Sequence, residues 1–452
     1  MLFCVISLQI YNIFFIFAHR MKKVIRKILF SVLMLWTVLP IVAQSVRLEI
    51  LADVRCVAGN YRAYPGPHKS LSAAPRGMHP FYISHYGCSG SHHHTKPSYY
   101  DSPWRTLTTA DSLGKLTALG RDVLERVQRI RDEAKNHWGE LTAVGAAQQT
   151  AIVRRLFERF PEVMGGGKTV VDARSTMAGR NILSMEHAML ELSRQNPRLK
   201  THHNATHRDA NFLNFFDRRL LAKQMDSTAQ ACYDAFVQQY PTHERLMRLL
   251  FCDADYVSRH VNAAELTEQL FKMAAHPQNG TLGDSVSLYD IFTADEIYTN
   301  WQKLNAWWYL AYGNTPANKG LQPFSQRNLL RKIIADADSL IRGEGTAVQL
   351  RFGSETAIMP LACLLDINGY GLSTTDLAGL AKAGWVNYRI FPMAANIQFV
   401  FYRRKAGDTD VLFKVLYNEE EATLPLPTRQ SPYYRWSDFR EYYLKKLDGY
   451  KE

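Results

Sequence analysis

The chain has 452 residues, of which 46% are hydrophobic and 12% aromatic, a composition typical of a globular protein with a substantial core. It contains no low-complexity tract and no internal repeat, which excludes a disordered or solenoid protein. The formal charge is +12, and residues 1–44 carry five basic residues and no acid, so subtracting five from +12 leaves about +7 on the rest. Such an excess favours anionic ligands, and without a long basic block we expect no nucleic-acid partner.

Residues 1–44 have the pattern of an export signal. The basic stretch Met21–Lys27 precedes the apolar stretch Ile28–Val42 and the small residue Ala43. We therefore expect Met21 to be the true start, and the mature protein to be periplasmic, at the cell surface or secreted. The apolar stretch is too short to span a membrane comfortably, so we expect no stable span after cleavage. A second membrane segment within residues 1–20 is the alternative.

Five cysteines follow this region, and their spacing matches no metal-ligand pattern. An odd number in an exported chain leaves at least one thiol unpaired. We expect scattered buried thiols, with Cys232 and Cys252 as the one pair to check for a disulfide. The five residues are Cys56, Cys88, Cys232, Cys252 and Cys363.

Strand-like and helical patterns alternate along the chain. A strand at Phe81–Gly87 is followed by amphipathic helices between residues 104 and 160. A short buried strand within Lys168–Thr176 leads into a helix at Arg180–Gln195, and residues 200–342 are expected to be mostly helical. The remaining predicted elements are a strand at Ala347–Gly353, an apolar helix at Thr356–Ile367, and strands at Asn396–Arg404, Asp410–Asn418 and Ala422–Leu426.

This order predicts an α/β core that carries an all-α insertion. We expect a signal region at 1–44, the first part of the core at 45–200, a mostly helical cap at 201–342 and the second part of the core at 343–452. The cap is expected to cover the carboxyl edge of the core sheet, where open α/β folds hold their sites.

The turn after the first predicted strand carries residue types that suggest chemistry. It reads Cys88-Ser89-Gly90-Ser91 and continues into three histidines, His92–His94. A thiol nucleophile and a metal site are the two readings that this pattern invites. Consecutive residues in a turn point in different directions, so three in a row seldom converge on one ion. We expect neither a metal nor a cofactor.

Five segments taken together resemble the histidine acid phosphatases, which are branch 2 of the histidine phosphatase superfamily. The likeness is greatest to the multiple inositol polyphosphate phosphatases and other phytase-like proteins, and it spans most of the chain after the signal. It implies a phosphoglycerate-mutase-like core sheet flanked by helices, with an all-α cap. The segments are YISHYG (Tyr82–Gly87), GELTAVGAAQQ (Gly139–Gln149), ARSTMAGRNILS (Ala173–Ser184), LRFGSETAIMPL (Leu350–Leu361) and NYRIFPMAANIQFVFYR (Asn387–Arg403).

The resemblance also implies a chemistry. In the family, a turn of the form Arg-His-Gly-x-Arg follows the first strand, and its His attacks phosphorus to form a phosphohistidine. The two Arg, a third Arg from a later motif and a second His bind the phosphoryl oxygens. An Asp or Glu beside the second His protonates the leaving oxygen. Fixed cationic groups suit the charge that spreads over these oxygens.

Four of these six groups are replaced in this chain. The resemblance places Ser89 at the nucleophilic His position and Ser354 at the second His position. Cys88 and His92 stand at the two Arg positions of the turn. Since both histidines are lost, the family reaction is expected to be impaired.

Two of the six groups are kept. Arg174 matches the third Arg position and Glu355 matches the acid, while Arg180 is a further candidate for contact with phosphate. An ordinary salt bridge, even between Arg174 and Glu355, is the alternative reading of the two kept residues.

The sequence therefore predicts an exported, catalytically impaired member of this family with a cleft for a phosphate ester such as an inositol phosphate. The first alternative is an active phosphomonoesterase that releases phosphate from inositol polyphosphates by altered chemistry, with Glu355 as acid. The second is a protein that binds a protein partner and holds no ligand in the cleft.

Overall fold

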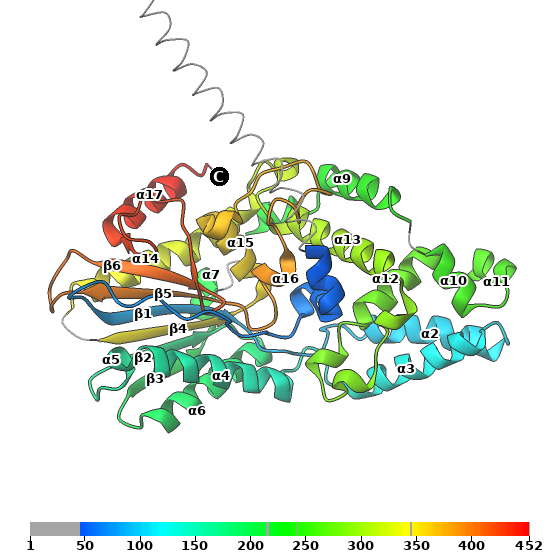
Figure 1. Cartoon of the computed structure of the whole chain (residues 1–452), viewed down its shortest axis with the longest axis horizontal. Coiled ribbons are helices and arrows are strands. Elements are labelled where there is room, and N and C mark those ends of the chain that lie inside the picture. The colour runs from blue at the N-terminus through cyan, green and yellow to red at the C-terminus, as the bar shows by residue number, and fades with distance from the viewer. Residues whose placement is uncertain (1–45, 214–216, 242, 344–345, 452) are drawn as a thin grey trace, which may run out of the picture.

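A mixed β-sheet forms the centre of the protein (Figure 1). The computed structural model describes residues 46–213, 217–241, 243–343 and 346–451, so the expected export signal lies outside the described residues. Within these ranges the sheet has eight strands in the order β3-β2-β4-β1-β5-β6-β7, with β8 paired to β6. The strands are β1 (His79–Cys88), β2 (Val170–Ser175), β3 (Lys200–Ala205), β4 (Ala347–Gly353), β5 (Asn396–Arg403), β6 (Leu412–Tyr417), β7 (Glu420–Ala422) and β8 (Tyr434–Arg435).

The parallel strands bring three sequence-distant segments to one edge. β1, β2, β3 and β4 run parallel, whereas β5 pairs antiparallel with β1. In the register, Cys88 lies opposite Gly353 and Ser175 lies opposite Phe352. The segments that follow β1, β2 and β4 therefore meet at the carboxyl edge of the sheet, where α/β folds place ligands.

Helices α4 (Ala143–Arg159), α5 (Pro161–Met164) and α6 (Gly179–Gln195) cover one face of the sheet (Figure 1). Their apolar side chains pack on residues from five strands, among them Ile83, Val171 and Val348. Strands β1 and β5 are buried along nearly their whole length, which explains why most of their residues are apolar or aromatic.

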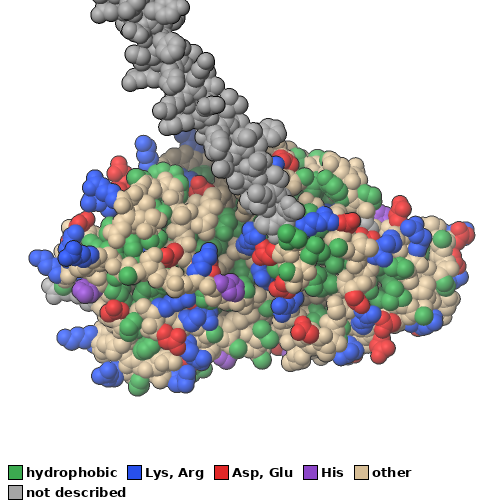
Figure 2. All heavy atoms as spheres, in the orientation of Figure 1, with side chains coloured by type: hydrophobic (Ala, Val, Ile, Leu, Met, Phe, Trp, Pro, Cys, Tyr) green, Lys and Arg blue, Asp and Glu red, His purple; other side chains and the backbone are tan. Residues whose placement is uncertain are grey.

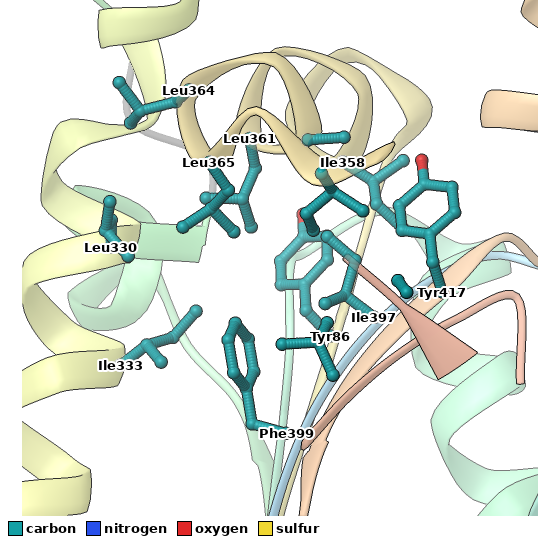
Figure 3. Packing of buried hydrophobic residues seen from close by; sticks show 14 of the residues in the cluster. Tyr86, Leu330, Ile333, Ile358, Leu361, Leu364, Leu365, Ile397, Phe399 and Tyr417 are labelled. Carbon is teal, nitrogen blue, oxygen red and sulfur yellow. The ribbon is translucent and has the colours of Figure 1, made fainter. Parts of the chain in front are cut away.

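The opposite face packs against α14 (Arg327–Ile341), α15 (Glu355–Leu365) and α17 (Trp436–Asp448). Figure 3 shows Leu330 and Ile333 of α14 facing Phe399 of β5, with Ile358 of α15 above Tyr86 of β1. Each such side chain is fully buried and contributes roughly 1.5–3 kcal/mol to stability.

A helical lobe lies beside the sheet and has its own core, built from residues such as Leu107, Val127, Leu250 and Trp301 (Figure 1). α2 and α3 join this lobe from the segment between β1 and β2. The remaining helices are α2 (Ser98–Ser112), α3 (Ala118–Ala134), α7 (Ala210–Leu213), α8 (Arg218–Ala222), α9 (Ser227–Gln238), α10 (Glu244–Leu250), α11 (Ala254–His260), α12 (Ala263–Met273), α13 (Ala294–Tyr312) and α16 (Asn387–Ile390), with the 3₁₀ helix η1 (Val54–Tyr61) before β1.

The structure differs from the predicted elements in two places. Residues 200–205 form the strand β3, at the start of the region 200–342 that was predicted to be mostly helical. β3 is an exposed edge strand of sequence KTHHNA, so it lacks the apolar residues that mark a strand. In the predicted strand Ala422–Leu426, only Ala422 is paired, at the end of β7. The domain boundaries remain a prediction, although β3 crosses the one expected at residue 200.

The five cysteines of the described residues are all free. Cys56, Cys88 and Cys363 are buried as expected, whereas Cys232 and Cys252 are exposed and form no disulfide. No helix in the described ranges is long and apolar enough to cross a membrane. On the face that Figure 2 shows, Lys and Arg side chains are interspersed with Asp and Glu, so the positive charge is not gathered into one patch there.

Candidate functional site

The turn that follows β1 lies between the end of β4 and the segment before β5. The amide of Ser89 donates to the carbonyl of Gly353 (3.2 Å). On the other side, the carbonyl of Ser89 accepts from the amide of Ala394 (2.9 Å). These bonds fix the backbone at the position where the resemblance places the family's nucleophile.

Two glycines allow this turn to pack against the start of α4. A Cβ atom added at Gly90 would lie 2.3 Å from the carbonyl oxygen of Gly145. One added at Gly145 would lie 2.2 Å from the carbonyl oxygen of Ser91. Neither position has room for a side chain. This close contact between two backbone segments therefore requires a glycine both in the turn, at Gly90, and near the start of α4, at Gly145.

Ser91 connects the turn to α4 and to the helical lobe. Gln148 of α4 accepts from the Ser91 amide (2.9 Å) and donates from Nε2 to Ser91 Oγ (2.9 Å). Ser91 Oγ in turn donates to Asn279 Oδ1 (2.6 Å), and Asn279 Nδ2 donates to the carbonyl of Tyr61 (2.7 Å). The sequence analysis did not place Asn279 or Tyr61 at the turn, because both lie far from it along the chain.

The turn is almost sealed from solvent. Cys88, Ser89 and His92 are only 3%, 2% and 3% exposed. Arg180 and Glu355, at the starts of α6 and α15, are partly exposed.

Cys88 is poorly suited to act as a nucleophile. Burial raises the pKa of its thiol well above the ordinary value, and the negative charge of Glu355 raises it further, while Arg180 acts in the opposite direction. The thiolate is the reactive form, so it is scarce here. The side chain instead packs in the apolar cluster that includes Tyr86.

The three consecutive histidines have three different surroundings. His92 directs Nδ1 to the carbonyl of Gly90 (3.1 Å), and His94 directs Nε2 to the carbonyl of Lys272 (3.3 Å). The ring of His93 stacks on that of His276, with 5.0 Å between centroids. Among the residues that the structure describes, no group of three or more His, Cys, Asp or Glu is arranged to hold a metal ion.

Burial keeps several of these rings neutral. It lowers the pKa of His92 to about 3, with the positive charge of Arg180 as the second cause. It lowers the pKa of His93 to about 4, with His276 as the second cause. Within β1, burial followed by the charge of Arg351 lowers the pKa of His85 to about 3. At neutral pH, His92 therefore does not supply the positive charge of the Arg that the resemblance implies at its position.

These neutral histidines predict a loss of stability in acid. In the unfolded chain these two histidines bind protons below about pH 6.5, whereas in the folded protein His85 and His92 stay neutral down to about pH 3. The free energy of unfolding therefore decreases as the pH is lowered from 6.5 towards 3. Each group contributes a slope of roughly 1.4 kcal/mol per pH unit. The free energy of unfolding decreases between pH 7 and pH 5, and we expect this decrease to be about 2 kcal/mol smaller in His85→Phe, as measured by urea unfolding at the two pH values.

An equal acid loss in His85→Phe and in the unaltered protein would contradict the assignment.

A second chain of hydrogen bonds supports His94 from the helical lobe. His276 Nε2 donates to Glu133 Oε2 (2.8 Å), and the Tyr100 hydroxyl donates to His276 Nδ1 (3.0 Å). The amide of His94 donates to the same hydroxyl (2.8 Å). Burial opposes the ionisation of Glu133, but hydrogen bonds from His276 and Thr281 outweigh it and lower the pKa to about 2.

Arg180 is the arginine that faces the turn. It is the second residue of α6, and its Nη1 lies 3.7 Å from the position of a Cβ atom added at Gly139, beside the segment that pairs with His92–His94. Its positive charge helps to lower the pKa of His92 and partly offsets the raised pKa of Cys88. Its Nε is buried and has no hydrogen-bond partner within the described part of the chain. An arginine donor left unused at a helix N-terminus suits an anionic ligand.

Arg174 does not face the turn. Its Nε and one terminal nitrogen donate to the two oxygens of Asp172 (3.0 and 2.9 Å), and its other terminal nitrogen lies 3.7 Å from Asp209. These residues line a separate cavity of about 160 Å³ beside α14. The expected phosphate contact of Arg174 therefore does not fit its placement, because alternate side chains of β2 point away from the turn.

Ser354 and Glu355 lie beside the turn as the resemblance implies. Ser354 precedes α15, and its hydroxyl hydrogen-bonds that of Thr356 (2.9 Å). After burial, the charge of Glu355 is the next cause that raises the pKa of Tyr61 and of Cys88. The salt bridge considered between Arg174 and Glu355 does not form, since Arg174 pairs with Asp172.

Comparison with known proteins identifies the family and the fold. The sequence profile of the Histidine phosphatase superfamily (branch 2) matches residues 131–418. A search of curated proteins gave no significant match. The multiple inositol polyphosphate phosphatase of Bifidobacterium longum in complex with phosphate superposes with a TM-score of 0.72 at 16% identity, over 87% of this chain and 98% of that chain.

Two further solved structures are similar. The same Bifidobacterium longum enzyme in complex with inositol hexasulfate gives a TM-score of 0.71 at 16% identity, over 85% of this chain and 96% of that chain. The phytase from D. castellii gives 0.65 at 14% identity, over 88% and 86% of the two chains. These identities are low, so the superpositions establish the fold, which is the predicted one.

The sequence profile covers more than half of the chain, and the central sheet with its flanking helices is that of the family. The family predicted from the sequence is thereby confirmed. The chain belongs to branch 2 of the histidine phosphatase superfamily.

Proposed function

We propose that this chain is an exported family member that has lost phosphohistidine chemistry and binds a phosphate monoester, such as an inositol phosphate, at the turn beside Arg180. The observation that carries the proposal is the presence of Ser89 and Ser354 at the two His positions, next to an arginine with an unused donor. The chemistry is lost while one anion-binding group remains.

The family reaction depends on groups that are missing here. A serine hydroxyl is a weak nucleophile at neutral pH unless a base activates it. The neighbouring His92 directs Nδ1 to Gly90 and not to Ser89. Loss of a nucleophile costs on the order of 10⁶ in turnover, and loss of one donor to the transition state about 10²–10³. Together these losses leave no useful phosphohistidine route.

The ligand class is supported by the relatives and by the charge of the turn. The Bifidobacterium longum phosphatase has been solved in complex with phosphate and with inositol hexasulfate. In this chain, Arg180 stands where an anion would be held, at the partly exposed side of the turn. One cation in place of several implies weak binding.

Two arginines of one segment provide a matched test. We expect Arg180→Met to weaken the binding of phenyl phosphate at least about tenfold, because a hydrogen bond to a charged group contributes about 1.5–3 kcal/mol. Arg174→Met should leave the affinity unchanged, because Asp172 already holds that side chain elsewhere. Isothermal titration calorimetry measures both. Equal losses in the two variants would contradict the placement of the ligand.

An active phosphomonoesterase with altered chemistry is the second candidate. It is favoured by Glu355, which keeps the acid position and faces the turn. This candidate predicts phosphate release from inositol phosphates that Glu355→Ala abolishes. A partner-binding protein without a ligand predicts instead that neither phytate nor phosphate changes the melting temperature.

Export is the remaining element of the proposal. It is supported by the basic stretch and the apolar stretch that end before Ala43. The N-terminal sequence of the protein recovered from the producing cells tests it, and we expect that sequence to begin just after Ala43.

A further inference from the structure

We infer that the turn selects the singly protonated, monoanionic form of a phosphate monoester, with His92 Nε2 accepting a hydrogen bond from the phosphate hydroxyl and Arg180 donating to a charged oxygen. This inference rests on the proposed function and specifies its ligand. It gives His92 a role that differs from that of the cationic residue expected at its position.

The hydrogen bond of His92 determines which ring nitrogen carries the proton. Its Nδ1 lies 3.1 Å from the carbonyl oxygen of Gly90, and a carbonyl can only accept. Nδ1 therefore carries the hydrogen, and Nε2 presents a lone pair. That lone pair is buried, and no donor reaches it within the described part of the chain. A ligand hydroxyl is the group that would satisfy it.

Arg180 offers the complementary group. Its Nε–H is also buried and without an acceptor among the described residues. Its Nη1 lies 3.7 Å from the position that a Cβ atom on Gly139 would take, and the segment that begins at Gly139 pairs with the histidines through the bond from the Gly139 amide to the His94 carbonyl (3.1 Å) and the bridge between His92 and Leu141. Arg180 therefore lies against the segment that holds His92. The turn thus presents one unused acceptor and one unused cationic donor. A sulfate ester and a phosphate dianion offer only acceptors, whereas a phosphate monoanion offers a donor and acceptors together.

The other groups near His92 also disfavour a dianion. Tyr61 of η1 packs 5.6 Å from the His92 ring, measured between centroids, and the charge of Glu355 is the second cause of the raised pKa of both Tyr61 and Cys88. The charges of Arg180 and Glu355 offset each other. A monoanionic ligand therefore adds one uncompensated negative charge to this buried turn, whereas a dianion would add two.

His92 itself does not take up the proton. Burial and Arg180 hold its pKa at about 3, and the adjacent rings of His93 and His94 have lowered pKa values for the same primary reason. Between pH 5.5 and pH 7.5 the proton that matters is therefore the one on the ligand. A phosphate monoester loses that proton with a pKa of about 6.

The test is calorimetry with the full-length mature protein and two probes, phenyl phosphate and phenyl sulfate. We expect phenyl phosphate to bind about 20-fold more tightly at pH 5.5 than at pH 7.5, because the monoanion falls to a few per cent of the ligand at the higher pH. Titrations at pH 7.5 in buffers of different ionisation enthalpy should show uptake of about one proton per ligand bound. Phenyl sulfate should bind more weakly, without proton uptake.

Each other outcome has a definite meaning. Binding of phenyl phosphate that is independent of pH, or tighter at pH 7.5, would overturn the inference and leave the proposed function standing. Proton uptake with both esters would place the proton on the protein and would also overturn it. Absence of binding at both pH values would defeat the proposed function itself.

Two variants locate the effect. His92→Phe keeps an aromatic ring but removes the acceptor, so proton uptake and the pH dependence should disappear. Glu355→Gln removes the balancing charge, so the affinity at pH 7.5 should rise towards that at pH 5.5. If His92→Phe does not fold, Glu355→Gln and the comparison of the two esters on the unaltered protein still decide the question.

Discussion

A variant with the four family side chains restored is expected to release phosphate from phytate at least about 10³-fold faster than the unaltered protein does. The unaltered protein should release phosphate no faster than a buffer blank. The reason for the gain is that the imidazole nucleophile and three phosphate-binding groups return to a backbone that the bonds of Ser89 to Gly353 and Ala394 still hold in place. Arg180 and Glu355 are already beside the turn. The variant combines Ser89→His, Ser354→His, Cys88→Arg and His92→Arg.

The control for this experiment carries Ser89→Ala with the other three substitutions unchanged. It should be inactive, because the nucleophile is then missing from an otherwise restored site. Since Cys88 and Ser89 are buried, thermal unfolding of both variants should be recorded beside the activity. Release of phosphate by the unaltered protein, with loss on Ser89→Ala, would show that the chain is an active enzyme and not an impaired one.

Glu419→Gln is expected to lower the free energy of unfolding by about 3 kcal/mol, because it removes the charge from a buried ion pair. Glu419 is fully buried. Its two carboxylate oxygens accept hydrogen bonds from Nε and Nη2 of Arg155 on α4 (2.9 and 2.6 Å). The Tyr64 hydroxyl donates to the same carboxylate (2.9 Å), and Arg159 donates to the Glu419 carbonyl (3.1 Å). The residue therefore joins α4 to the turn between β6 and β7.

Urea unfolding at pH 7 measures this loss. The exposed pair of Glu186 and His203 offers a matched control, since Glu186→Gln should change stability by less than about 1 kcal/mol. A similar decrease in the free energy of unfolding in both variants would show that burial does not make the Glu419 ion pair more important for stability than an exposed pair.

Local patterns in the sequence were sufficient to predict most of the elements. The strand predicted at Ala347–Gly353 has those bounds, and β1 and β5 were evident because strands buried on both faces have continuous apolar sequences. β3 was missed because an exposed edge strand needs no apolar side chain. Its pairing with β2 is a property of the folded sheet, and its own residues do not encode it.

The site was only partly predictable. The replacement of both histidines is a prediction from the sequence, since Ser89 and Ser354 each stand in a short motif next to a strand. The sequence could not tell whether Arg174 or Arg180 lies at the turn, because both belong to one motif. The position at which β2 ends determines which of the two side chains is directed towards the turn. The roles of Asn279, Tyr61 and His276 were also not predictable, since they reach the turn from distant parts of the chain.

By itself, then, the sequence was sufficient to predict the family, most of the strands along the chain and the replacement of the family's chemical groups, because these depend on residue identity and on short-range periodicity. Only the tertiary structure decided that the turn is almost sealed, that an Arg180 donor is buried without a partner among the described residues and that the Nε2 of His92 is an unused acceptor. The physical reason is that burial, charge compensation and the protonated nitrogen of an imidazole depend on neighbours that folding brings together from several elements. The same residues in an unfolded chain would have ordinary pKa values and no fixed partners.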